Sequence, residues 1–474
     1  MNLDTETNQK LAIRGTVVVC LMAIFLRFWG LERFNLLVFD EVYYAIFGNN
    51  YLTHTPFFNS HPPLSQYLIA IGIWIGDRLP FGQEHLNAFT GSIHSTFSYR
   101  WMNALFGSLI PPLVATLTYQ VSQRKSYALL AALFISLDGL YLVESRYALN
   151  GIYLVSFGLL GQILVLIATK DRRMNNRGLL LGSGVAFGAS IACKWNGLSF
   201  LAGIYVLVAI SKFWVSMRSS EPIDNPHNSL LDRLARIKPI EIAIGLIITP
   251  IITYFLLWIP HLIQNPQPNL IDVQFVMLNY HKTINDGTGV HPYCASWYTW
   301  PLMMRPIAYY FNEYKPNYYY DVHAMGNPLL WWLGLAAVFG SIGSIGRQIW
   351  WNSQQETIEK NVLAPIRALD PHYLGVPLFI VVNYAVNLLP WVPVTRCLFI
   401  YHYIGGVLFA ILGLAWFVDN WLRSRSKLWQ SIGLTTIFSV AAAFVFWAPV
   451  YLGLSIEKTQ LSWRLWDFWI FNWI

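Results

Sequence analysis

Long runs of apolar residues, separated by short polar segments, recur along almost the whole chain. A run of roughly 17–25 apolar residues is long enough for a helix to cross the hydrocarbon core of a bilayer. The runs therefore predict an all-α polytopic membrane protein with two large outer loops. We expect about eleven spans, at residues 13–30, 98–121, 127–143, 148–168, 178–194, 197–214, 239–260, 328–347, 373–391, 400–418 and 430–450.

Composition agrees with a chain that lies in lipid. Hydrophobic residues make up 55% of the 474 positions and charged residues only 12%, whereas about 25% of a soluble domain is charged. The run at 64–76 is too short for a span and predicts a helix at the membrane interface. Two predicted spans meet at 194–196, which calls for a tight turn or a partial re-entry there.

Basic residues set the predicted orientation. They gather in short loops such as "KDRRMNNR" and "RSRSK", which the positive-inside rule assigns to the cytoplasmic side together with the N-terminus. The net charge of +7 then needs no nucleic-acid partner. We expect an N-terminal catalytic module at 1–260 that includes outer loop 31–97, an aromatic-rich outer loop at 261–327, and a C-terminal membrane module at 328–474 with three to four apolar segments.

The first apolar run lacks a small-residue cleavage site and is expected to be an uncleaved anchor in the bilayer. The cysteines Cys20, Cys193, Cys294 and Cys397 are widely scattered. Their spacing predicts neither a metal site nor a disulfide framework. Two adjacent acids without a third ligand motif are also weak evidence for a divalent ion, so we expect no cofactor.

Asp40 and Glu41 stand in the segment "LLVFDEVYYAIF", directly after the first span. Acids that start a helix gain from the positive end of the helix dipole, which is a purely structural explanation. Neighbouring residues on a helix point in different directions, however. One carboxylate can then accept a proton while the other is held by an Arg or the backbone, and we predict that this pair is catalytic.

Other ionisable residues fall on the same predicted outer side, where burial is costly and usually functional. Arg146, Lys194, Arg396 and His402 are candidates for binding an anionic phosphate. Structural alternatives stay open: Arg146 can pair with Glu144 or reach the interface, Arg396 and His402 can cap a helix end, and His61 before two prolines can simply order a turn.

Aromatic residues recur at short intervals through the segment 291–328. Such a segment can lie at the membrane interface as an amphipathic stretch. It can equally form the roof of a cavity that holds a polar head group or a peptide. On the second interpretation we expect His61, Trp297, Tyr298 and Trp300 to line an acceptor site.

Several motifs resemble the protein O-mannosyltransferases, in the order that this family has them. They are "FDEVYYAIFGNNYLTHTPFFNSHPPLSQYL", "YRWMNALFGSLIPPL", "ESRYALNGIYL", "ACKWNGL", "SWYTWPLMMRPIAYYF", "NPLLWWLG" and "RCLFIYHYIGG". Together they cover nearly the whole chain. The resemblance implies a GT-C fold and the transfer of mannose from polyprenyl-phosphate mannose to Ser or Thr hydroxyls of secreted or membrane proteins, on the non-cytoplasmic face.

The resemblance also assigns roles. It implies that Asp40 is the general base and that Glu41 is its partner, also in contact with donor or acceptor. It further implies that the donor phosphate is bound by Arg146, Lys194, Arg396 and His402, and that a single displacement inverts the anomeric centre. Eukaryotic members carry a β-trefoil domain in the loop after the seventh span, and this chain has no room for one. It resembles the shorter bacterial form, which implies the periplasmic face of the plasma membrane and leaves acceptor recognition open.

Three alternatives remain at the level of sequence. A related transferase could move a sugar from the same class of lipid donor to a lipid or polysaccharide, as a lipid A aminoarabinose transferase does. A secondary transporter would instead show broken helices near the bilayer midplane and an internal repeat. A membrane scaffold without activity would leave the ionisable residues on the outer side unexplained.

Overall fold

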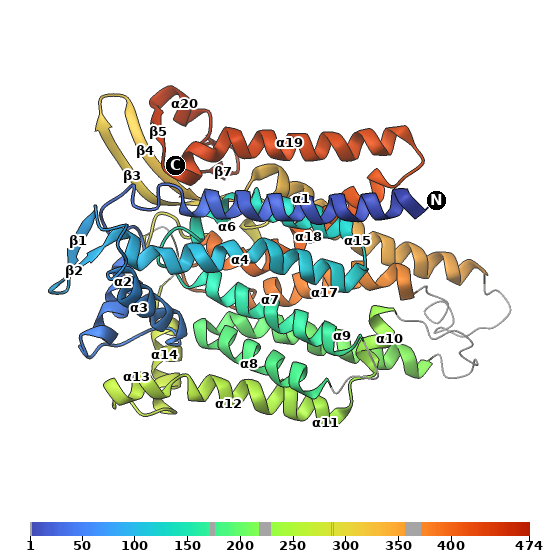
Figure 1. The fold of residues 1–474 in the computed structure, drawn as a ribbon, viewed down its shortest axis with the longest axis horizontal. Helices are drawn as coiled ribbons and strands as arrows, with labels where there is room; N and C mark the ends of the chain where they lie inside the picture. The colour runs from blue at the N-terminus through green and yellow to red at the C-terminus, as the bar shows by residue number, and fades with distance from the viewer. Residues whose placement is uncertain (1, 171–175, 218–228, 286, 288, 356–370) are drawn as a thin grey trace.

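The computed structural model describes residues 2–170, 176–217, 229–285, 287, 289–355 and 371–474. Long helices run roughly side by side (Figure 1). Part of the basic loop 170–177 lies outside the described residues.

The first half of the chain supplies one long helix and a small outer unit before the next long helices. The elements are α1 (Asn2–Phe28), α2 (Glu41–Leu52), α3 (Leu64–Gly76), β1 (Leu86–Phe89), β2 (Ser92–Ser95), α4 (Thr96–Ser122), α5 (Lys125–Ser136), α6 (Gly139–Glu144), α7 (Gly151–Ala168), α8 (Arg177–Cys193), a 3₁₀ turn (Trp195–Gly197) and α9 (Leu198–Met217).

The second half repeats the alternation of long helices with short outer elements. It contains α10 (Leu230–Ala235), α11 (Pro239–Glu241), a π-helical stretch (Ile242–Ile248), α12 (Thr249–Leu256), α13 (Ile259–Gln264), α14 (Asp272–Thr283), a 3₁₀ turn (Trp297–Thr299), β3 (Ile307–Lys315), β4 (Tyr318–Ala324), α15 (Pro328–Gln355), α17 (Pro371–Leu388), two 3₁₀ turns (Leu389–Trp391 and Ile400–Tyr403), α18 (Ile404–Leu422), α19 (Lys427–Leu452), β5 (Ser455–Glu457), α20 (Lys458–Ser462), β6 (Asp467–Phe468) and β7 (Phe471–Asn472). The elements α2, α3, α13, α14 and the strands β1–β4 lie at one end of the long helices, whereas the short helices α10 and α11 lie at the other end (Figure 1).

Each of the predicted spans coincides with a helical segment. Among the described residues, 8 helices are long and apolar enough to cross a membrane. The third predicted span is broken into α5 and α6 because Asp138 caps the new helix, accepting a hydrogen bond from the Tyr141 amide at 3.0 Å. The predicted tight turn is present too, since Lys194 is extended and a single 3₁₀ turn joins α8 to α9.

The two outer segments pack against each other. The Asn265 side chain accepts a hydrogen bond from the Phe57 amide at 2.8 Å, and the His281 ring lies 2.9 Å from the Ser60 carbonyl. A hairpin, β3–β4, extends from the same end and gains β5 as a third antiparallel strand (Figure 1). The sequence analysis predicted none of these strands, although the fold is mostly helical as expected.

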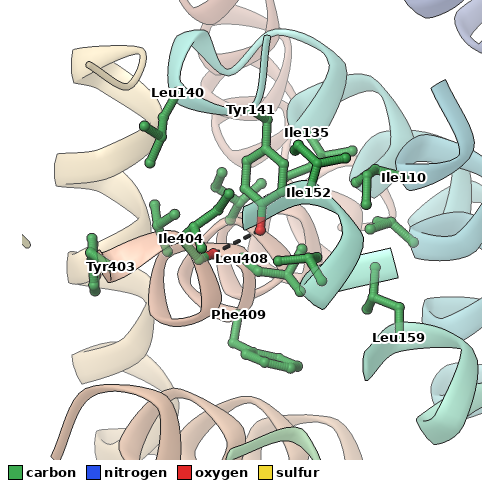
Figure 2. Close-up of a cluster of buried hydrophobic side chains, with 14 of the residues drawn as sticks. Ile110, Ile135, Leu140, Tyr141, Ile152, Leu159, Tyr403, Ile404, Leu408 and Phe409 are labelled. Carbon is green, nitrogen blue, oxygen red and sulfur yellow. Dashed lines mark hydrogen bonds between the residues drawn. The ribbon is translucent and has the colours of Figure 1, made fainter. Parts of the chain in front are cut away.

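Apolar side chains from α4 to α7 and from α18 form the centre of the protein. Figure 2 shows Tyr141 of α6 reaching α18, where its hydroxyl donates to the Ile404 carbonyl at 2.7 Å. Helices α7 and α9 approach closely at Gly158, because a Cβ there would stand only 2.5 Å from the Phe200 ring. This rigid centre fixes the helix ends that carry the candidate site.

Candidate active site

Asp40 occupies the N-cap position of α2 but does not cap it. Its carboxylate makes no hydrogen bond to the first turn of the helix. The preceding residue, Phe39, has a φ of 53°, which is uncommon for a bulky side chain and is held by its surroundings. Its ring stacks on Tyr309 of β3 with centroids 4.0 Å apart. The backbone at Asp40 is therefore positioned by packing and its carboxylate is left available.

Glu41 is fully buried, and both of its oxygens are occupied. Arg100 of α4 donates to them at 2.9 and 2.7 Å, and the amides of Val38 and Ala148 donate at 2.8 and 2.9 Å. A buried carboxylate held in this way is fully satisfied. Its contacts leave no oxygen for a donor or an acceptor, so the expected substrate contact finds no support. Glu41 instead joins α2 to α4 and to the turn before α7.

Arg146 is also buried, and its guanidinium reaches the C-terminal end of α1. It donates to the carbonyls of Leu26, Arg27, Trp29 and Gly30 at 2.7–3.2 Å. The final carbonyls of a helix have no partner within the helix, and a cation placed there satisfies them. The structural alternative left open in the sequence, a pairing with Glu144, is not found between these two described residues, because the guanidinium is engaged with the carbonyls at the end of α1. These contacts support a structural role for Arg146 and do not support phosphate binding.

Lys194 is the cation whose charge acts on the carboxyl of Asp40. It interacts electrostatically with Asp40, with Glu144 at the end of α6, and with Arg396. Its ammonium group also lies 5.3 Å from the centre of the Tyr401 ring. Burial raises the pKa of Asp40 to about 6, and the positive charge of Lys194 opposes that shift. The pair provides a carboxylate that ionises near neutral pH beside a positive charge.

Arg396 and His402 lie between α17 and α18 and not on one continuous helix. Arg396 is half-buried, while His402 is buried and its Nδ1 lies 2.9 Å from the Phe399 carbonyl. The His402 ring stacks on Trp300, with centroids 6.0 Å apart. Both interact electrostatically with Lys194 and with His61. The structure thus brings Lys194, Arg396 and His402 together, without Arg146.

His61, from the His-Pro-Pro turn, faces a second histidine that the sequence analysis did not single out. Its ring centroid lies 5.2 Å from that of His281 on α14 and 6.4 Å from that of Tyr44 on α2. Burial, with the charges of Lys194 and its neighbours, lowers the pKa of His61 well below its usual range. Burial lowers the pKa of His281 to about 4. Both rings are therefore neutral near pH 7.

The aromatic candidates separate into buried and exposed residues. Trp300 is fully buried, and its indole donates to the Ala295 carbonyl at 2.9 Å. Trp297 is half-buried, and 63% of the Tyr298 side chain is exposed. Trp300 therefore packs behind His402, and only the other two present surface to a ligand.

Two further features of the site differ from the expectations from sequence, which named Glu144 only as a possible partner of Arg146 and predicted no disulfide framework. Glu144 is buried and accepts a hydrogen bond from the Tyr309 hydroxyl, which places a second carboxylate near Asp40. Cys294 and Cys397 form a disulfide across 103 residues, so the expectation that the cysteines form no disulfide was wrong. The reason is spatial, because the fold brings the second outer segment against the connection between α17 and α18. Within the described residues, no group of three or more His, Cys, Asp or Glu is placed to hold a metal ion.

Comparison with protein families gives two matches that together span the chain. Residues 17–264 match the family described as dolichyl-phosphate-mannose-protein mannosyltransferase. Residues 266–469 match the C-terminal four-transmembrane region of protein O-mannosyltransferase. All the residues of the candidate site that precede α14 fall within the first match.

Individual relatives are distant but cover most of the chain. The polyprenol-phosphate-mannose–protein mannosyltransferase of Mycolicibacterium smegmatis is 23% identical, over 90% of this chain and 86% of the relative. The enzyme of the same name from Mycobacterium tuberculosis is 21% identical, over 97% and 92%.

Solved structures show the same fold. The Saccharomyces cerevisiae protein O-mannosyltransferase Pmt1–Pmt2 complex bound to the sugar donor superimposes with a TM-score of 0.76, at 15% identity, over 97% of this chain and 94% of that one. The Archaeoglobus fulgidus oligosaccharyltransferase AglB gives 0.52 at 12% identity, over 95% and 56%. These likenesses identify the GT-C fold.

Proposed function

The chain belongs to the dolichyl-phosphate-mannose-protein mannosyltransferase family, and on that premise we propose that it transfers mannose from a polyprenyl-phosphate mannose to Ser or Thr hydroxyls of a protein acceptor. The observation that carries the proposal is the contrast within the acidic pair. Glu41 is fully occupied, whereas Asp40 is left uncapped beside Lys194.

Asp40 acts as the general base. A Ser or Thr hydroxyl is a weak nucleophile, and a carboxylate within hydrogen-bond reach activates it by accepting its proton during attack. The hydroxyl oxygen bonds to C1 of mannose while the bond from C1 to the phosphate oxygen breaks, and the electron pair of that bond leaves with the phosphate. One displacement of this kind inverts the anomeric centre.

Lys194 and Arg396 balance the charge that develops on the departing phosphate. Preorganised cations at a developing charge are a large source of rate enhancement, and none of the steps above is routed through a metal. An Arg offers a fork of donors and a Lys a compact point charge. The neutral rings of His61 and His281 are suited to hydrogen bonds with sugar hydroxyls.

We place the reaction on the extracytoplasmic face of a plasma membrane. Two observations support this side. The basic clusters of the short loops indicate the cytoplasmic face. The Cys294–Cys397 disulfide, a bond that persists in oxidising compartments, joins the second outer segment to the connection between α17 and α18.

To test this proposal, purified protein is incubated with labelled polyprenyl-phosphate mannose and a Ser/Thr-rich peptide, and the product that carries the label is identified. Label on the peptide, with an inverted anomeric centre, is the expected result. Label that appears on lipid instead would identify a transferase with a different acceptor and overturn the proposal. Unchanged donor in the presence of folded protein would also overturn it.

A further inference from the structure

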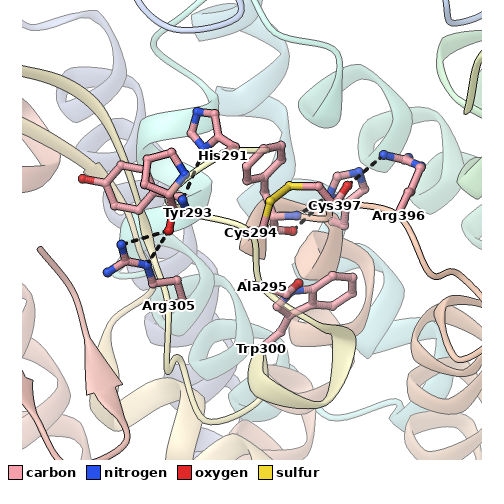
Figure 3. Close-up of a disulfide and its surroundings, with 11 residues drawn as sticks. His291, Tyr293, Cys294, Ala295, Trp300, Arg305, Arg396 and Cys397 are labelled. Carbon is pink, nitrogen blue, oxygen red and sulfur yellow. Dashed lines mark hydrogen bonds between the residues drawn. A yellow bond between two sulfur atoms is a disulfide. The ribbon is translucent and has the colours of Figure 1, made fainter. Parts of the chain in front are cut away.

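The Cys294–Cys397 disulfide lies at the edge of the candidate site without taking part in the proposed chemistry. The Cα atoms of the two residues are 5.1 Å apart. Cys294 precedes the 3₁₀ turn at 297–299, and Cys397 lies in the connection between α17 and α18. The bond therefore joins the second outer segment to a connection that is far away in sequence (Figure 3).

Regular structure does not hold the connection in place. Residues 392–399 belong to no helix or strand. The connection is tied down by two backbone hydrogen bonds, from the Ala295 amide to the Leu398 carbonyl at 2.7 Å and from the Cys397 amide to the Asn285 carbonyl at 3.0 Å. Both bonds lead to the same outer segment as the disulfide.

Arg396 directly precedes the bridged cysteine. Its guanidinium donates to the carbonyl of Cys397 at 3.1 Å, as Figure 3 shows. Within the described residues Arg396 has no ion-pair partner. It instead interacts electrostatically with another cation, Lys194, and with the ring of His281.

Like charges repel, so Arg396 and Lys194 drive each other apart when no anion lies between them. A connection without secondary structure would yield to that repulsion and carry Arg396 toward water. The covalent bond at the next residue opposes this movement. The geometry points to Cys294 and Cys397 as positioning residues, whose disulfide holds Arg396 in place for the donor phosphate.

This inference rests on the proposed function, because it gives the disulfide a role in binding the phosphate of that donor. If the disulfide only stabilises the fold, a different result is expected for the donor KM. Its loss would lower thermal stability and the amount of active protein, and the donor KM of the remaining active protein would stay the same.

The first experiment measures donor KM, acceptor KM and kcat for Cys294→Ser, Cys397→Ser and the double variant. We expect donor KM to rise about 3–10-fold, a part of the loss that removal of a charge-assisted hydrogen bond gives, while acceptor KM stays within twofold. All three variants should behave alike, because each breaks the same bond. Cys20→Ser in α1 is the matched control and should keep wild-type values.

In the second experiment, the disulfide of the wild-type protein is reduced with a water-soluble phosphine. The disulfide gains two electrons and two protons and becomes two thiols, and the phosphine is oxidised to its oxide with the oxygen of water. Donor KM should rise as in the double variant and return after reoxidation. The double variant should not respond to either treatment. Because this experiment measures the wild-type protein itself, its main result does not depend on whether a variant folds.

A double-mutant cycle with Arg396→Met decides whether the disulfide acts through Arg396. In the Arg396→Met background, loss of the disulfide should not raise donor KM any further. Additive effects, or an unchanged donor KM in the double Ser variant, would overturn the inference while leaving transfer by the wild type intact. Failure of the wild type to transfer mannose at all would instead be the failure of the proposed function.

Discussion

Two groups of buried charges lie at the outer end of the helices, and they differ in how well they are satisfied. In the first, Glu41 is held by Arg100 and two amides, and Arg146 is held by four carbonyls. In the second, Asp40 caps nothing, and Lys194 interacts electrostatically both with the like charge of Arg396 and with the carboxyls of Asp40 and Glu144. We refer to these as the anchored group and the open group.

The difference shows what each group contributes to the protein. Taking charges out of water costs several kcal/mol per ion, and hydrogen bonds and partners must compensate for it. The anchored group is compensated within the protein at every charged atom but Nε of Arg146, which is buried without a hydrogen-bond partner. The group joins α1, α2, α4 and the turn before α7. In the open group, we propose that the phosphate of the donor balances the charge of Lys194 and Arg396 that the nearby carboxyls leave uncompensated.

The largest expected effect comes from Asp40→Asn, which removes the proposed general base of the open group. Transfer should fall by about 10²–10⁴, the usual range for loss of a general base. Donor binding should survive, because removal of a negative charge near a phosphate does not weaken its binding. Measurement of transfer and donor binding on the same preparation checks this, and wild-type transfer by folded Asp40→Asn would refute the assignment.

Glu41→Gln tests the anchored group, and here the loss should appear in stability. The substitution leaves Arg100 buried with no charged partner, which costs about 3–5 kcal/mol. We expect a lower thermal midpoint and less folded protein in the membrane. By contrast, Asp40→Asn should not lower the midpoint at pH 7. Burial raises the Asp40 pKa, so the contribution of that residue to stability is lost as pH rises through about 6.

The fold followed from the apolar runs because span length is fixed by the bilayer and not by tertiary packing. The tight turn at Lys194 was predicted from the two touching runs. The break at Asp138 was not, because the run at 127–143 was expected to form a single span. The hairpin β3–β4 was not, because it depends on packing against Phe34 and Phe39 from a distant segment.

The site was predictable only in part, for the same reason. Sequence identified which residues are ionisable and fall on one side, but not which of them find partners inside the protein. Arg146 and Lys194 were equivalent candidates in sequence, and only their contacts separate them. The contact of His281 with the first outer segment, and the disulfide between the second outer segment and the connection from α17 to α18, both depend on segments that are distant in sequence. No local pattern encodes such contacts.

Replacement of Arg146 and of Lys194 by Met therefore compares a cation of the anchored group directly with a cation of the open group. Lys194→Met should raise donor KM about 10–100-fold, as expected for loss of a charge-assisted hydrogen bond worth 1.5–3 kcal/mol, with acceptor KM nearly unchanged. Arg146→Met should mainly reduce the thermal midpoint, because it exposes the end of α1 to an apolar side chain. If Arg146→Met instead raised the donor KM and left the thermal midpoint unchanged, Arg146 would belong to the open group.

The smallest effect concerns the pH at which the open group becomes active. If Asp40 must be ionised to accept a proton, kcat/KM should decline below an apparent pKa of about 6. His281 does not interfere, since its pKa is about 4, and the pKa of His61 is lowered well below its usual range. The positive charge of Lys194 lowers the Asp40 pKa, so Lys194→Met should move the acid limb to higher pH, by less than about one unit at the dielectric of a partly buried pair. Burial raises the pKa of Glu144 to about 7, so this carboxyl is mostly neutral at the acid limb and Glu144→Gln should leave the limb nearly in place. Loss of the limb in Glu144→Gln would assign it to Glu144 and not to Asp40. An acid limb that does not respond to Lys194→Met would mean that a group other than Asp40 sets it.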